Sequence, residues 1–144
     1  MMLSSRNPSI HGNNFKEVVS SYLEEMQHHG VIESFSKNIK YSSQFHAPFV
    51  AVLKNNIDVV IFSTTSARSD RIKEDQWDAW GIKSCSKKTT YCVLVLPDGI
   101  SEKEHGFAKA EIQRIKREGY ISKVDTILFL SELQKYLETF NEVK

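Results

Sequence analysis

The first regular pattern along the chain is helical. Asn14 and Glu17 have the spacing of a capping box, in which side chains bond to the free backbone amides of a first helical turn. The apolar positions that follow recur every three or four residues, as one face of a helix requires: Phe15, Val18, Val19, Tyr22 and Met26. The sequence therefore predicts a helix that starts at residue 14 and ends near Gly30.

Shorter runs rich in β-branched residues come next. The pattern permits a short strand at 39–41, and it predicts strands at 49–53 and 57–62 with a turn at 54–56 between them. This pair is expected to form a hairpin. Residues 59–62 are all apolar, which is typical of a strand covered on both faces.

The spacing returns to that of a helix after residue 66. Ser66, Ser69 and Asp70 are candidate caps, and the predicted helix runs to Ile82. A buried strand is predicted at 91–96, where Pro97 stops it. Two capping boxes then predict two more helices on either side of a strand at 126–130. The caps and apolar stripes of these helices are Ser101, Glu104, Ala108, Ile112 and Ile115 for the first, and Ser131, Gln134, Leu133, Leu137 and Phe140 for the second.

This order of elements predicts an α/β fold with a mixed sheet flanked by helices. Strands that alternate with helices are expected to run parallel and to be joined by right-handed crossovers. The length suits a single domain, which we expect to span 14–144 after a loosely ordered N-terminus at 1–13.

Composition narrows the classes of function. No run approaches the ~18 apolar residues that cross a bilayer, and the N-terminus has no apolar core, so we expect a cytoplasmic protein without a membrane partner. The net charge of +1 is low for a protein that binds DNA by charge alone. Basic residues nevertheless cluster at 68–73, 83–88 and 109–117.

One segment carries a more specific signal. Residues 63–77 run STTSARSDRIKEDQW, which resembles the K-T-S-x-R-E-R-W-K-Q segment of many restriction enzymes, where a lysine-bearing strand enters a helix. Together with the element order, the chain is similar to the PD-(D/E)xK nuclease core of type II restriction endonucleases over residues 14–137. The resemblance implies an α-β-β-β-α-β core with an extra C-terminal α-β-α.

The resemblance also implies a partner, double-stranded DNA. Hydroxyl and guanidinium groups at the start of a helix form a ready site for phosphate. The residues expected to contact DNA are Ser66, Arg68, Arg71, Lys73 and Gln76. Because palindromic sites demand two-fold symmetry, we expect a homodimer or a complex with a partner subunit.

This sequence departs from the family's pattern at the positions of the metal site. Phe62-Ser63-Thr64 stands where an acid-x-lysine is expected, and Pro48-Phe49 stands where Pro-Asp is expected. The acids that remain for catalysis are Asp58, Glu74 and Glu17, with Asp58 and Glu74 as the candidate Mg²⁺ ligands.

Three functions stay open. The first is a non-cutting DNA-binding protein, such as a component of a restriction-modification system. The second is an active Mg²⁺-dependent deoxyribonuclease with relocated acids. The third is an α/β domain that binds an anion or nucleotide, with residues 63–66 as the cradle for a phosphate.

Overall fold

The computed structural model describes residues 13–65, 69–98 and 124–141, together with Ala110, Gln113, Arg114 and Arg117. Within these residues the elements follow in the order α1 (Asn13–His28), β1 (Ser34–Lys40), β2 (His46–Val52), β3 (Asp58–Ser63), α2 (Ser69–Cys85), β4 (Thr90–Leu96), β5 (Thr126–Phe129) and α4 (Leu130–Asn141). The expected N-terminal segment up to residue 12 lies outside the described residues, as does most of the helix predicted from Ser101. No helix in the described part of the chain has the length and apolar character to cross a membrane.

The strands form one five-stranded mixed sheet in sequence order, from β1 to β5. β1 pairs with β2, and β2 with β3, in antiparallel fashion, whereas β3, β4 and β5 run parallel to their neighbours. The predicted hairpin and the predicted parallel strands are therefore confirmed. β1 is longer than the short strand expected at 39–41, because its mostly polar, solvent-exposed sequence hides its β structure.

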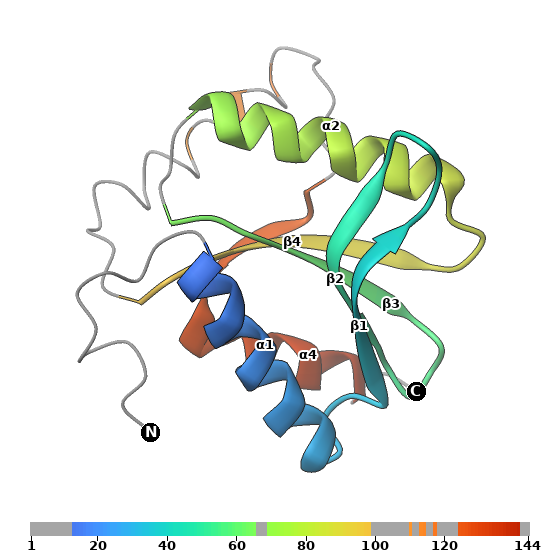
Figure 1. Ribbon diagram of the computed structural model, residues 1–144, viewed down its shortest axis with the longest axis vertical. Coiled ribbons are helices and arrows are strands. Elements are labelled where there is room, and N and C mark those ends of the chain that lie inside the picture. The colour runs from blue at the N-terminus through green and yellow to red at the C-terminus, as the bar shows by residue number, and fades with distance from the viewer. Residues whose placement is uncertain are drawn as a thin grey trace.

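Helices cover both faces of the sheet, with α2 on one face and α1 and α4 on the other (Figure 1). The predicted apolar stripe of α1 packs inward through Phe15, Val19 and Met26, and meets α4 at Leu133 and Leu137. A second core lies on the opposite face of the sheet, where α2 contributes Ile72, Ala79 and Ile82. Both cores draw on β3 and β4, which explains the continuous apolar runs of these strands.

The β1–β2 hairpin changes face partway along its length. Residues four apart on a strand normally point to the same side. Phe35 nevertheless packs with the core under α1, while Ile39 packs with the core under α2. Asn38 lies between them with a φ of 55°, and it faces Pro48, which has no amide hydrogen to donate. The irregular pair Asn38–Pro48 therefore turns the end of the hairpin away from α1 and towards α2.

The last helix begins differently from the capping box predicted at Ser131 and Gln134, and that prediction is wrong. α4 starts at Leu130, and Glu132 Oε1 accepts a hydrogen bond of 2.9 Å from the backbone amide of Phe129. The Ser131 hydroxyl donates instead to Asp98 Oδ1 at 2.7 Å. The acid one position after the serine caps the helix because the strand leads directly into it without a loop.

Candidate functional site

Two adjoining cavities open where the hairpin leaves α1. The larger has a volume of about 590 Å³ and the smaller about 220 Å³. Both are lined by Lys16, Asn38 and Pro48, so we treat them as one groove. The groove follows directly from the Asn38–Pro48 irregularity, which pulls the hairpin away from the helix that would otherwise cover it.

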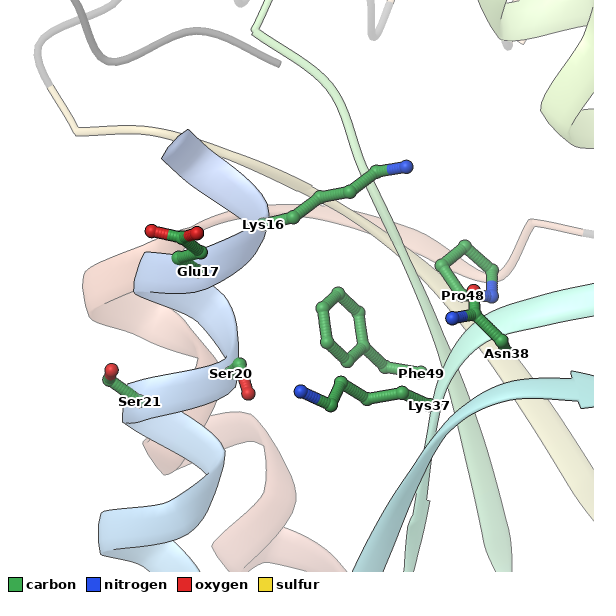
Figure 2. Close-up of a pocket in the computed structure, with 8 residues that line it drawn as sticks. All are labelled: Lys16, Glu17, Ser20, Ser21, Lys37, Asn38, Pro48 and Phe49. Atoms are coloured by element: carbon green, nitrogen blue, oxygen red, sulfur yellow. The ribbon is translucent and has the colours of Figure 1, made fainter. Parts of the chain in front are cut away.

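The larger cavity forms the basic end of the groove. Lys16 comes from α1 and Lys37 from β1, and the buried ring of Phe49 lies between them (Figure 2). Figure 2 shows Lys37 reaching towards α1, where Ser20 faces it across the cavity. Two lysines from separate elements thus line one cavity, which is an arrangement suited to an anion.

The smaller cavity forms the acidic end. It is lined by His46 at the start of β2, by Ser63 at the end of β3, and by Glu74, Asp75 and Asp78 of α2. Burial raises the pKa of the Asp78 carboxyl above its ordinary value, and the nearby Glu74 carboxylate raises this pKa further, while His46 lowers it. The Ser63 hydroxyl oxygen is buried and makes no hydrogen bond within the described part of the chain. It is therefore a polar group suited to a ligand.

The smaller cavity lies where the family resemblance expects the nuclease centre. Phe62, which stands at the acid of the acid-x-lysine pattern, lines it together with Ser63 and with Pro48 of the Pro-Asp pattern. None of the three can coordinate a metal as a carboxylate does. Among the residues that the structure describes, no group of three histidine, cysteine or acidic side chains is placed to hold a metal ion. The residues present do not fit the Mg²⁺ site that the resemblance implies.

The three candidate catalytic acids are not brought together. Asp58 lies at the start of β3, where its Oδ1 is 2.6 Å from Lys88 Nζ. Glu74 lines the cavity at the other end of β3, roughly 16 Å away at the usual rise of a strand. Glu17 lies in the larger cavity, and its carboxylate points away from Phe49 (Figure 2). The expectation that Asp58 and Glu74 share one metal ion is therefore corrected, because Asp58 pairs with Lys88 at the opposite end of β3.

The structure places the residues expected to contact DNA in different environments. Ser66 and Arg68 lie outside the described residues, and so does the side chain of Arg71, whose backbone belongs to α2. Lys73 is exposed on α2. Gln76 is only 2% exposed, and its Oε1 accepts a hydrogen bond of 3.1 Å from the amide of Val124. The expected DNA contact by Gln76 is wrong, because this side chain joins α2 to the segment before β5.

Sequence reasoning missed most residues of the groove. Lys16 and Lys37 belong to no motif, and only the folded hairpin brings them to one cavity. A signal did exist for the acidic end, since Glu74 and Asp78 are four residues apart on a predicted helix and so share a face. Pro48 inside a β-rich run was a second signal, because proline in a strand marks an irregularity.

Comparison with known proteins gives the fold and nothing more specific. No protein-family model matches the chain, and no curated protein matches it. The crystal structure of protein VC1899 from Vibrio cholerae is similar, with a TM-score of 0.51 and 16% sequence identity. The match covers 90% of this chain but 33% of VC1899, so the chain spans about a third of the length of that protein. The likeness supports a shared α/β architecture.

Proposed function

We propose that this protein binds double-stranded DNA through the groove, as a domain of restriction-endonuclease-like fold that does not cut. The observation that carries the proposal is that Lys16 and Lys37, from two separate elements, line one cavity. That cavity adjoins the place where the family resemblance puts the phosphodiester. The sheet order and the α-β-β-β-α-β succession are consistent with the same fold.

The chemistry of the basic end suits a phosphate backbone. Lysine acts as a point charge for phosphate, and Ser20 and Asn38 add neutral hydrogen-bonding groups to the same lining. The half-buried Pro48 supplies apolar surface against which a deoxyribose can lie. Contacts of this kind hold a duplex in register without distinguishing its sequence.

The acidic end of the groove restricts the path that a bound DNA backbone can take. Glu74 and Asp78 repel phosphate oxygens, so a bound backbone follows the lysines of α1 and β1 and avoids the carboxylates of α2. A cutting centre would require these acids to hold a metal ion together with further ligands, and the described residues do not supply such a set. Binding without cleavage is the function that this arrangement supports best.

The test is duplex binding, followed by fluorescence anisotropy over a series of salt concentrations. Lys16→Ala and Lys37→Ala should each weaken binding to all duplex sequences. Each should also lower the slope of log K against log[salt] by about 1, as expected for the loss of one phosphate contact. Lys54→Ala is the matched control, because it removes the same charge from the exposed β2–β3 turn outside the groove. Equal effects of all three substitutions on DNA binding would refute the proposal that DNA binds in the groove.

Two further assays separate the alternatives. Cleavage of duplex DNA that requires Mg²⁺, and that Glu74→Gln or Asp78→Asn abolishes, would replace the proposal with an active nuclease. If DNA is not bound but a mononucleotide raises the Tm, the groove is a small-molecule site. Retarded DNA that stays intact in Mg²⁺ is the result we expect.

A further inference from the structure

A cluster of aromatic rings lies beside the groove, on α2 and the end of the hairpin. Trp77 and Trp80 stack with their ring centroids 4.9 Å apart and their planes at 27°. Phe45 touches both, with centroid distances of 6.0 Å to Trp77 and 6.3 Å to Trp80. We call these three residues the aromatic shelf. Trp77 is 50% exposed, which no other large apolar side chain in the described part of the chain reaches.

The shelf is held in place before any ligand arrives. Phe45 is buried, and Trp80 packs against the core under α2. Gly81 lies directly under the Phe45 ring, where any larger residue would collide with it. A ring fixed in this way loses little conformational freedom when a ligand stacks on it, which favours binding.

The shelf adjoins the acidic end of the groove along the chain. Phe45 of the shelf precedes His46 of the smaller cavity, and Trp77 precedes Asp78 of the same cavity. Lys73 is exposed four residues before Trp77, so the two side chains lie on one side of α2. A flat aromatic face with a cation one turn away matches a nucleobase and its phosphate.

The size of the exposed surface decides which partner fits. A stable contact between two copies of a protein buries roughly 1,000 Å² or more, whereas one half-exposed indole offers about the area of a single base. We propose that the aromatic shelf stacks an unpaired base of a nucleic-acid strand whose phosphates lie in the groove. This inference rests on the proposed function, and it deepens it by adding that an unpaired base of the bound DNA is held at the shelf.

The experiment compares two 12-nucleotide single strands with the same number of phosphates. One is oligothymidylate and the other carries abasic sites throughout. Both tryptophans of the chain belong to the shelf, so quenching of intrinsic fluorescence reports stacking there. The protein should bind oligothymidylate roughly 5- to 150-fold more tightly than the abasic strand, the range for stacking of a base on an aromatic side chain.

Trp77→Ala should remove this preference while leaving the affinity for the abasic strand unchanged, and Trp77→Phe should retain part of it. Lys16→Ala should instead weaken binding to both strands equally. If Trp77→Ala leaves the preference intact, the stacking inference is wrong while the groove proposal stands. If Trp77→Ala instead shifts sedimentation from dimer to monomer, the shelf is an interface between copies, and the inference is also overturned. Failure to bind any strand or duplex overturns both proposals.

Discussion

Gly81 of α2 lies against the ring of Phe45, and replacing it with alanine puts two known effects in opposition. Alanine is the better helix former, by about 1 kcal/mol. The added Cβ, however, would collide with three ring carbons of Phe45, Cε1, Cδ1 and Cζ. These approaches fall well inside the ~3.5–4.0 Å that packed carbon atoms keep.

The collision should outweigh the helical gain. Phe45 cannot turn aside freely, because Trp77 and Trp80 pack against its ring. Overpacking of this kind costs about 1–3 kcal/mol, so Gly81→Ala should lower the free energy of unfolding by about 1 kcal/mol. At the usual scaling for this chain length, the Tm should fall by about 2–4 °C.

The assay is a double-mutant cycle, with unfolding in urea followed by circular dichroism. In a Phe45→Ala background the ring is gone, and Gly81→Ala should then stabilise the protein by up to about 1 kcal/mol through helix propensity alone. The sign of the substitution is thus expected to reverse between the two backgrounds. The reasoning is refuted if Gly81→Ala raises the Tm of the otherwise native protein, or if its effect has the same sign in both backgrounds.

Three further predictions concern buried or half-buried polar groups. Asp58→Asn, which removes the charge paired with Lys88, should cost about 1 kcal/mol in urea unfolding, and it should leave DNA affinity unchanged because Asp58 lies outside the groove. Burial raises the pKa of Cys92 to about 12, so a chromogenic disulfide at pH 8 should titrate the exposed Cys85 alone in the native protein and both thiols after denaturation. The raised pKa of Asp78 means that the folded state binds its proton more tightly than the unfolded state, so this group stabilises the fold at low pH and the contribution is lost as pH rises through the folded pKa. Asp78→Asn should therefore be more stable than the native protein at pH 7, and this advantage should disappear below about pH 4, near the unfolded pKa; an advantage that is the same at both pH values would contradict the assignment.

Much of the α/β architecture could be predicted because its signals are local. The apolar stripe of α1 and the unbroken apolar run of β3 are patterns in adjacent residues, and each has one physical explanation. β1 was harder to predict, since an exposed edge strand needs few apolar side chains. The start of α4 was misplaced because Ser131 and Glu132 are both good capping residues, and only the geometry of the preceding strand selects between them.

The candidate site was less predictable, because its residues meet only through the fold. Lys16 and Lys37 are ordinary surface lysines in the sequence, and the departure of the hairpin from α1 is what gives them a common cavity. The prediction that Gln76 contacts DNA was wrong for the opposite reason. Its place in a basic helix suggested a role in DNA contact, but the helix turns it towards Val124, where it satisfies a buried amide.

The irregular pair Asn38–Pro48 also bears on how this protein behaves at high concentration. β1 is the outer strand of the sheet on its side, with β2 as its partner among the described residues, and such an edge normally offers a template for a strand from another molecule. Here the left-handed backbone of Asn38 interrupts the regular row of hydrogen-bonding groups halfway along β1, and the flanking Lys37 and Lys40 place two positive charges on the same edge. A second copy of the chain pairing there would find an interrupted row of backbone hydrogen-bonding groups. Its lysines would also be repelled by those of the first copy. The sheet is therefore protected against the edge-to-edge pairing that begins aggregation.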